Sequence, residues 1–314
     1  MLLRRVTLHQ LKIFTSLARH LNMTRAAEEL HMTPAALSIQ IKQLSGTVGA
    51  PLHEQIGKRL YLTDAGRLVY EAAVDVFGRL EQLSGELSAD RGLERGSLKL
   101  SIITTAKYFA PHFLGAFCKL HPGIQATLEV ANRDQLLERL KQNLDDLYIM
   151  GQTPEHVSVI AQPFMENPLI LLAPADHPLA SQSAIEPAQL ADEPFIMREP
   201  GSGTRLAAER FFEQHDVRLK IRMTLGSNEA IKQAVAGGLG LAVLSKHTLT
   251  LDAASGAFAV LDVQGFPLRR QWYVIYPSTK HISSVARAFL HYITEEGASR
   301  SQQPVSEVIG REAV

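Results

Sequence analysis

The sequence predicts an α+β protein of several domains: a small winged helix-turn-helix head, one long linker helix, and a larger α/β body. Three patterns lead to this prediction. Residues 26–44 read as two short helices joined by a tight turn, residues 66–92 carry an apolar stripe at helical spacing, and strands alternate with helices beyond Gly96. A chain of 314 residues has room for two or three such domains.

The two short helices of the head have clear expected starts. Thr24 is expected to cap the first helix, whose Ala26 and Ala27 face inward. Thr33 is expected to cap the second helix, and Pro34 takes its first position, where a missing N–H does no harm.

The second helix divides into an apolar face and a hydrogen-bonding face. Its apolar residues recur at intervals of three and four and are expected to pack inward: Leu37, Ile41 and Leu44. Its other faces carry polar side chains without acids: Ser38, Gln40, Lys42 and Gln43. This division is typical of a DNA recognition helix. The alternative is an ordinary helical hairpin within a larger core.

A short strand follows the two helices and suggests a wing. Gly57 is expected to break the preceding helix, and Lys58 and Arg59 stand before the alternating Leu60-Tyr61-Leu62. Basic side chains on a loop tip suit contact with DNA phosphates or the minor groove, because neutralising phosphates releases counterions. A solvated turn is the alternative for a lone basic pair.

The charge is unevenly distributed along the chain. The whole sequence has a formal net charge of zero, which taken alone disfavours nucleic acid as a partner. Up to Ala65, however, eight Lys and Arg residues stand against four Asp and Glu residues, so this region carries about +4. The charge asymmetry is that expected of a DNA-binding head on a ligand-binding body.

These N-terminal residues resemble the LysR-type transcriptional regulators. LHQLKIFTSLARHLNMTRAAEELHMTPAALSIQIKQL, followed by LYLTDAG, follows the family pattern nearly position by position. With the patterns above, the resemblance implies a DNA-binding domain over 1–65 whose DNA-contacting residues are Thr24, Thr33, Pro34, Ala35, Ser38, Gln40, Lys42, Lys58 and Arg59. The chain departs from the family at Pro34, Ser45, His53 and Gln55, where Gln, Glu, Phe and Arg are usual, and these departures bear on operator sequence and affinity.

The long helix over 66–92 is expected to mediate dimerisation. Its apolar stripe consists of Leu68, Ala72, Val76, Leu80, Leu83 and Leu87. A stripe of this length beside a small domain calls for a second copy of itself, unless it packs on the chain's own body. Members of the LysR family dimerise through this helix. The resemblance to them therefore favours pairing with a second copy and implies a homotetramer built as a dimer of dimers.

Strands and helices alternate through the body. The expected strands lie at 98–102, 124–130, 146–150, 194–197, 222–225, 240–244 and 272–276, and the expected helices at 105–120, 134–142, 204–214, 228–236 and 283–294. This alternation predicts parallel sheets with covered faces in two lobes. It resembles the type 2 periplasmic-binding-protein fold with which LysR regulators sense effectors. The effector-binding domain is expected over 93–296, with lobe I at about 93–165 and 267–296, lobe II at about 166–266, and a disordered tail over 297–314.

Three expected helix starts in the body carry polar groups that suit an anion. They are Thr104-Thr105, the run 201–205, and Gly226-Ser227-Asn228, each placed where a strand ends. Each alone is more often a plain helix cap, but open α/β sheets bind ligands where such ends converge. The expected effector-binding residues are Thr104, Thr105, Asn132, Ser202, Gly203, Thr204, Arg205 and Asn228, with Asn132 taken from the LysR resemblance alone.

Three longer strings in the body look like the CbbR subgroup of LysR-type activators, which serve Calvin-cycle carbon-fixation operons. They are KYFAP at 107–111, REPGSGTR at 198–205 and LGSNEAIKQAVAGGLGLAVLS at 225–245. The subgroup implies a phosphorylated or nucleotide effector. Two departures bear on the identity of the effector: Gln152 lies in a loop that commonly carries arginine, and Tyr148 replaces a small residue.

The sequence gives little support to an enzymatic function. No G-x-x-x-x-G-K-[ST], G-x-S-x-G or H-E-x-x-H string occurs, and the twelve histidines are scattered, so neither catalysis nor a metal is expected. Gly237-Gly238-Leu239-Gly240 follows a helix and is expected to be its C-terminal cap. Cys118, the single cysteine, is expected to be a buried small hydrophobe.

The expected function is therefore that of a cytoplasmic LysR-type activator of carbon-fixation genes without cofactors. Its expected partners are promoter DNA, an anionic effector, further copies of itself and RNA polymerase, with no membrane, because the apolar runs are far too short to span one and the N-terminus lacks a sustained apolar region. Open alternatives are a LysR-type regulator of another metabolic operon, or a metabolite sensor with impaired DNA binding. A transport-type solute receptor would need an export signal and no basic head.

Overall fold

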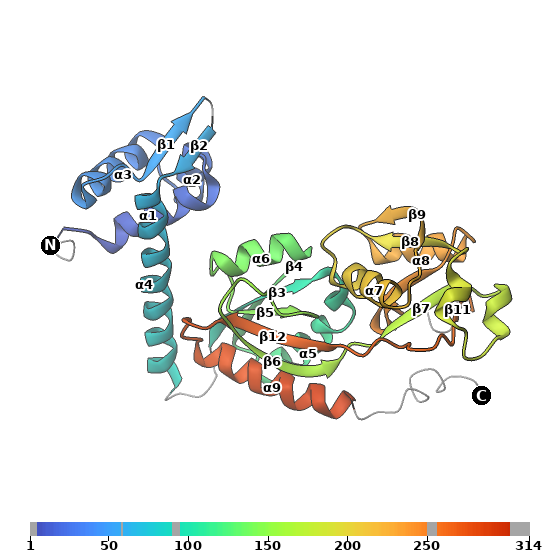
Figure 1. Cartoon of the computed structure of the whole chain (residues 1–314). Helices are drawn as coiled ribbons and strands as arrows, with labels where there is room; N and C mark the ends of the chain where they lie inside the picture. The colour runs from blue at the N-terminus through green and yellow to red at the C-terminus, as the bar shows by residue number, and fades with distance from the viewer. Residues whose placement is uncertain (1–4, 58, 90–94, 250–255, 302–314) are drawn as a thin grey trace. The chain divides into compact units, whose positions relative to one another are not determined.

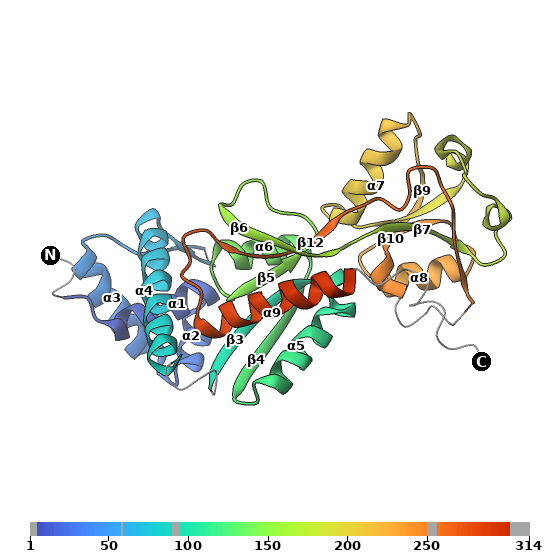
Figure 2. The ribbon, with the colours of Figure 1, turned by 90° about the horizontal axis from the view of Figure 1, so that it is seen from below.

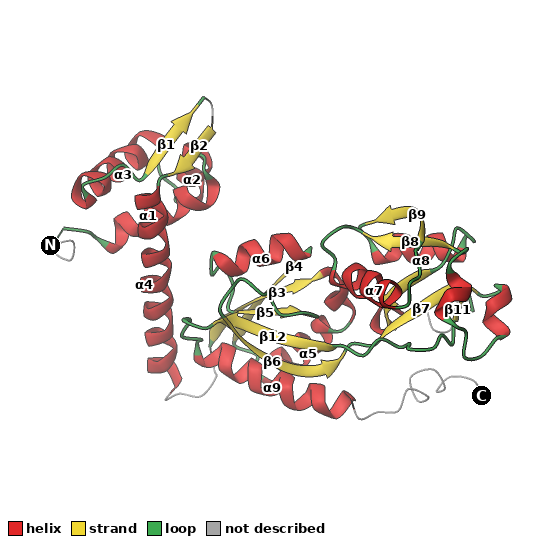
Figure 3. Cartoon of the chain, viewed as in Figure 1, coloured by secondary structure: helices red, strands yellow, loops and turns green. Residues whose placement is uncertain are grey.

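The computed structural model describes residues 5–57, 59–89, 95–249 and 256–301. Two compact units divide the chain, Met1–Ser84 and Gly85–Val314. Figure 1 labels the helices and strands of each unit, and Figure 3 distinguishes them by kind. In the described ranges, no helix has the length and apolar character needed to cross a membrane.

The first unit is a helical head with a two-stranded wing. Its elements are α1 (Leu8–His20), α2 (Met23–Glu29), α3 (Pro34–Val48), β1 (His53–Ile56), β2 (Arg59–Leu62) and most of α4 (Asp64–Ala89). Phe14, Ala26 and Leu37, one from each short helix, are fully buried in a shared core. Because α2 and α3 share this core with α1, the geometry of the turn between them is fixed.

The start of α3 confirms the sequence prediction, whereas the start of α2 corrects it. The Thr33 hydroxyl accepts a hydrogen bond from Ala36 N at 3.2 Å, and Pro34 occupies the first turn. Helix α2 begins one residue before Thr24, so Asn22 caps it by accepting from Thr24 N and Arg25 N. The prediction that Thr24 is the cap is therefore wrong. Asn22 is as good a capping residue as Thr24 and stands at the required spacing.

The wing is a hairpin, of which the sequence predicted one strand. Helix α3 ends at Gly49, whose φ of +83° gives a left-handed C-cap, so Gly57 does not break a helix. Gly57, with a φ of +63°, instead lies in the turn between the antiparallel β1 and β2. At Gly66, an added Cβ would overlap the Leu52 carbonyl, so only glycine lets the start of α4 pack against the hairpin.

The apolar stripe of α4 is exposed in the single chain. Leu68 is 68% exposed, Leu80 42% and Leu83 48%. Ala72 and Val76 are also exposed, and the side chain of Leu87 lies outside the described residues. A stripe of this kind on a single helix is the surface expected of a helix that pairs with another copy.

The second unit begins with lobe I, which is built on a five-stranded sheet in the order β4-β3-β5-β12-β6. These strands are β3 (Gly96–Ile103), β4 (Ile124–Ala131), β5 (Leu147–Met150), β6 (Val159–Glu166) and β12 (Gln271–Pro277). Helices α5 (Ala110–Leu120) and α9 (Ser284–Ser301) cover one face with a core that includes Phe113 and Phe289. Helix α6 (Arg133–Lys141) covers the other face through Leu136 and Leu140.

Lobe II is built on two smaller sheets, β10-β7-β11 and β8-β9. The strands are β7 (Leu169–Pro174), β8 (Pro194–Arg198), β9 (Lys220–Leu225), β10 (Ala242–Ser245) and β11 (Phe258–Val260). Helix α7 (Gly203–Gln214) packs Phe211 and Phe212 into one core, and α8 (Asn228–Ala236) packs Ile231 and Val235 into another. Short 3-10 turns at Pro178–Ser181, Pro187–Leu190 and Lys246–Leu249 complete the lobe.

Two antiparallel segments cross between the lobes. The segment after β6 pairs with the segment before β12, because Asn167 N donates to Arg270 O at 2.8 Å and Leu169 and Leu268 exchange backbone hydrogen bonds. Figure 2 shows these crossing segments running from the sheet of lobe I into that of lobe II. Residues in these segments therefore lie at the boundary between the two lobes.

The sequence prediction of parallel sheets is only partly correct, because β8 and β9 pair in parallel but several other strands do not. Strands β3, β4 and β5 are parallel, but β12 runs antiparallel to both β5 and β6, and β10 and β11 run antiparallel to β7. The chain returns from lobe II to lobe I, as the sequence predicted, and places β12 between β5 and β6. Its antiparallel pairing joins distant segments, and local patterns do not reveal it.

Three further predictions in the body need correction. The helix expected over 105–120 is a 3-10 turn, Thr104–Tyr108, followed by α5, because Pro111 has no N–H to continue a helix that begins earlier. Helix α9 continues to Ser301, past the expected end, so only residues 302–314 of the expected tail lie outside the described residues. Cys118 is only partly buried at the edge of the lobe I core.

Candidate functional site

The outer face of α3 presents polar groups to solvent. Thr33, Pro34, Ala35, Ser38 and Lys42 are exposed, and Gln40 is half-buried. Leu37, Ile41 and Leu44 are buried, as the spacing predicted. The sequence pattern missed Ile39, which is 58% exposed on the same helix. Hydroxyl, amide and ammonium groups beside an exposed aliphatic side chain suit contact with base edges and with a thymine methyl group.

The other residues expected at DNA lie on α2 and on the wing. Thr24 is exposed in the first turn of α2, and Arg59 is exposed at the start of β2, whereas Lys58 lies outside the described residues. The Gln55 side chain donates to the Gly57 carbonyl at 3.1 Å, so this departure from the family pattern closes the hairpin turn. Burial lowers the pKa of His53, which favours its neutral form.

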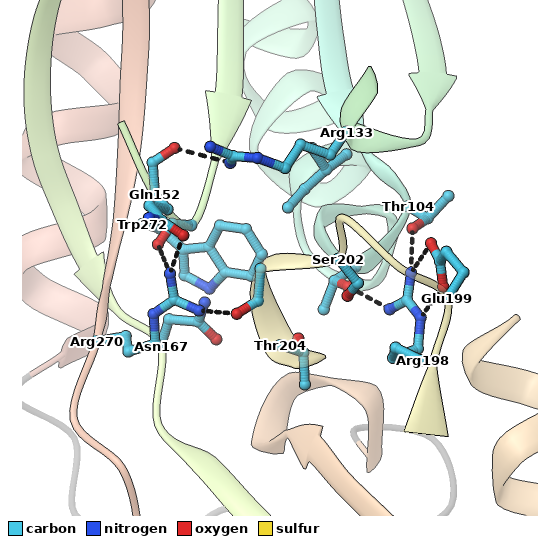
Figure 4. A pocket seen from close by; sticks show the side chains of 14 residues that line it. Thr104, Arg133, Gln152, Asn167, Arg198, Glu199, Ser202, Thr204, Arg270 and Trp272 are labelled. Atoms are coloured by element: carbon cyan, nitrogen blue, oxygen red, sulfur yellow. Dashed lines mark hydrogen bonds and ion pairs between the residues drawn. The ribbon is translucent and has the colours of Figure 1, made fainter. Parts of the chain in front are cut away.

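The second candidate site is a cavity between the two lobes of the body. The space between its lining atoms, with the open mouth included, is about 450 Å³. The lining comes from the ends of β3, β5 and β8, the starts of α6 and α7, and the crossing segments: Ile103, Thr104, Thr105, Arg133, Gly151, Gln152, Asn167, Arg198, Glu199, Ser202, Gly203, Thr204, Arg270 and Trp272. Figure 4 shows Arg198 and Glu199 on one side and Arg133 and Arg270 on the other.

Arg198, the last residue of β8, is held rigidly at one end of the cavity. Its Nε and Nη2 donate to the two carboxylate oxygens of Glu199 at 2.7 and 2.8 Å. Nη1 donates to Asn228 Oδ1 at 2.6 Å, and weaker bonds reach Thr104 and Thr105. The side chain is only 4% exposed, so this charge is fixed and desolvated.

The opposite end holds two arginines without a carboxylate partner among the described residues. Arg270 donates to the carbonyls of Gly203 at 2.6 Å and Gly151 at 2.9 Å, and to Gln152 Oε1 at 3.3 Å. The Arg133 side chain donates to the Gln152 carbonyl at 3.3 Å. Burial lowers the pKa of both guanidinium groups, and for Arg270 the neighbouring positive charge of Arg133 lowers it further. An anion that binds between them would relieve this repulsion.

Two uncharged donors complete the cavity. Ser202 precedes α7, but its side chain makes no capping hydrogen bond, so the first N–H groups of this helix are available to an anion. Trp272 is fully buried in the wall, and its indole Nε1 has no hydrogen-bond partner in the described part of the chain. Within those same ranges, no cluster of three or more His, Cys, Asp or Glu side chains is suited to a metal ion.

The structure brings five of the eight expected effector-binding residues to the cavity: Thr104, Thr105, Ser202, Gly203 and Thr204. The other three lie behind its lining. Asn132 caps α6 in a capping box, and Arg205 pairs with Glu209 at 2.7 Å and donates to the Arg198 carbonyl. Asn228 is buried and supports Arg198.

Sequence reasoning missed the charged residues of the cavity. Arg198 opens the string REPGSGTR, in which the sequence prediction names only Arg205 as a charged effector-binding residue, and Arg133 stands directly after Asn132. Arg270 carried no local signal. It reaches the cavity only because the chain returns from lobe II.

Comparison with known proteins agrees with this architecture. Residues 8–67 match the bacterial regulatory helix-turn-helix protein, lysR family, and residues 91–298 match the LysR substrate binding domain. A RuBisCO operon transcriptional regulator of Acidithiobacillus ferrooxidans is 56% identical over 97% of this chain and 98% of that protein. The HTH-type transcriptional activator CmpR of Synechocystis is 46% identical over 93% of this chain and 96% of that protein.

A solved structure resembles the body. The regulatory domain of CcmR from Synechocystis PCC6803, in complex with 2-PG, is 48% identical, with a TM-score of 0.63 over 65% of this chain and 98% of that one.

A winged helix-turn-helix joined to a two-lobed body with a ligand-sized cavity defines a DNA-binding transcriptional regulator that responds to a small molecule. The chain belongs to the LysR family of such regulators, and its relatives include proteins named CbbR.

Proposed function

We propose that this protein activates carbon-fixation genes, the RuBisCO operon among them. The observation that carries the proposal is the 56% identity, over 97% of this chain, to a RuBisCO operon transcriptional regulator. Further relatives named as RuBisCO operon or CbbR regulators, at 45% and 38% identity over more than nine-tenths of the chain, support the same target.

The proposed effector is a small phosphorylated anion held in the interlobe cavity. Support comes from Arg133 and Arg270, which form no ion pair with the described residues, from the open start of α7 and from the indole N–H of Trp272, which has no hydrogen-bond partner in the described ranges. The CcmR regulatory domain, at 48% identity, has been solved with 2-phosphoglycolate, which has this chemistry. Hydrogen-bond donors and guanidinium groups suffice for such a ligand, so binding needs no metal ion.

The proposed DNA complex is a dimer or a dimer of dimers on a partly palindromic promoter site. Helix α3 enters the major groove with Ser38, and the wing with Lys58 and Arg59 contacts the DNA backbone or the minor groove. The exposed stripe of α4 supports the self-association. An activator of this kind acts in the cytoplasm and contacts RNA polymerase.

Effector and DNA are thermodynamically coupled in this proposal. The ligand contacts both lobes, so it favours whichever arrangement of the lobes it binds more tightly. If DNA also binds one arrangement more tightly, the ligand changes the DNA affinity, and DNA changes the ligand affinity by the same factor.

Genome-wide footprinting with the purified full-length protein tests the target, with and without 2-phosphoglycolate. We expect protection of a site upstream of RuBisCO genes and a change in its extent when the ligand is added. Protection confined to promoters of other metabolic operons would replace the proposed target, and a promoter site unaffected by any phosphorylated metabolite would refute the effector.

A further inference from the structure

The two ends of the cavity differ in charge because of one residue, Glu199. All five N–H groups of the Arg198 guanidinium are already used by protein acceptors: two on Glu199, one on Asn228, and one each on the two threonines. An anion that enters this end therefore finds a neutralised arginine with no spare donor.

At the other end, most guanidinium donors are available. The described contacts of Arg133 amount to one hydrogen bond, and those of Arg270 to three, all to uncharged acceptors. The cavity therefore presents two guanidinium groups that form no ion pair among the described residues at the Arg133–Arg270 end, where Asp134 and Glu155 act on Arg133 only from a greater distance, and an ion pair at the Arg198 end.

Glu199 is placed so that its charge acts on a ligand. Its side chain is 29% exposed and lines the cavity, whereas that of Arg198 is 4% exposed. A ligand carboxylate at this end has to lie beside the Glu199 carboxylate or displace it from Arg198, and both events cost free energy.

We propose that Glu199 sets the charge selectivity of the cavity. It directs the doubly charged phosphate of an effector to Arg133 and Arg270, and it penalises a second anionic group at the Arg198 end. Repulsion that excludes wrong ligands is a general source of specificity. This inference rests on the proposed function, because it assumes that a phosphorylated anion binds between the lobes.

The test compares two ligands that share a phosphate and differ at the other end. 2-Phosphoglycolate carries a carboxylate there, and 2-hydroxyethyl phosphate carries a neutral hydroxyl. Dissociation constants for both are measured by calorimetry on the full-length protein and on Glu199→Gln, which keeps the shape and removes the charge. We expect Glu199→Gln to bind 2-phosphoglycolate about tenfold more tightly and 2-hydroxyethyl phosphate within about threefold of wild type.

Two control variants separate charge from position. Glu199→Asp keeps the negative charge, and Glu209→Gln makes the same chemical change on α7, where Glu209 pairs with Arg205 behind the cavity lining. Both controls should keep the wild-type ratio of the two dissociation constants. Thermal unfolding of each variant checks that it is folded.

The outcomes are distinguishable. An unchanged ratio in Glu199→Gln, or an equal loss of both ligands, would mean that Glu199 only positions Arg198 and would overturn the inference. If wild type binds neither ligand, the phosphorylated effector itself is refuted, and the inference with it. If wild type binds both and only the ratio fails to shift, the proposed function stands without this role for Glu199.

Discussion

Replacement of Arg133 is expected to affect ligand affinity strongly and the free energy of unfolding only slightly, so it separates the two effects. In the described structure its side chain donates one hydrogen bond, to the Gln152 carbonyl at 3.3 Å, and makes no ion pair with the described carboxylates. Replacing it by glutamine therefore removes little that holds the fold, and we expect the free energy of unfolding to change by less than about 1 kcal/mol. Burying the Arg133 guanidinium is itself unfavourable, so its removal offsets part of the free energy lost with the hydrogen bond.

The same substitution should strongly weaken the binding of a phosphorylated anion. A hydrogen bond to a charged group contributes about 1.5–3 kcal/mol, which corresponds to an increase of roughly 10- to 150-fold in the dissociation constant. Calorimetry with 2-phosphoglycolate on wild type and Arg133→Gln measures this effect, and thermal unfolding measures stability.

Arg205→Gln is the matched control for Arg133→Gln. Arg205 pairs with Glu209 and lies outside the lining of the cavity. We therefore expect its replacement to leave ligand affinity within about threefold of wild type. Undiminished binding by Arg133→Gln, or an equal loss in Arg205→Gln, would refute the assignment of the phosphate to the Arg133–Arg270 end.

Three further predictions concern DNA, self-association and pH. Replacing the exposed Arg59 by alanine should weaken binding to all DNA sequences alike and lower the salt-dependence slope by roughly one unit; loss at a single base position would contradict a backbone contact. Replacing Leu80, which is 42% exposed in the α4 stripe, by glutamate should dissociate the proposed dimer in sedimentation; an unchanged mass would show that the stripe is not the interface. Burial lowers the pKa of His247 below its ordinary value of 6.5, so the unfolded chain takes up this proton first, and stability falls as pH decreases below about 6.5. His247→Phe, which keeps ring contacts with Phe109, should show a shallower fall in denaturant unfolding between pH 7 and pH 5, and an equally steep fall would assign the effect to other groups.

The head was largely predictable from the sequence because its signals are local. Periodic apolar residues and the Thr33-Pro34 start define α3 within one stretch of chain. The error at α2 arose because Asn22 and Thr24, two residues apart, are both residue types that cap helices, and the helix begins after the first of them.

The polar part of the cavity was partly predictable, and its charges were not. Thr104 and Ser202–Thr204 stand at strand and helix ends, which local patterns reveal. Arg198 and Arg205 belong to one short string, and only the pleat of β8 and the packing of α7 decide which one lines the cavity. Arg270 depends on a pairing between distant segments, for which a single sequence gives no local sign.

The position of Arg270 has a mechanical consequence. Its backbone carbonyl accepts from Asn167 within the crossing segments, while its side chain bridges Gly151 of lobe I and Gly203 of lobe II. An anion bound by this guanidinium would act directly on the crossing segments, about which the lobes would turn. The residue that would bind the anion is thus itself part of the segments that join the lobes. A change in the angle between the lobes would follow from anion binding without passing through other packed side chains.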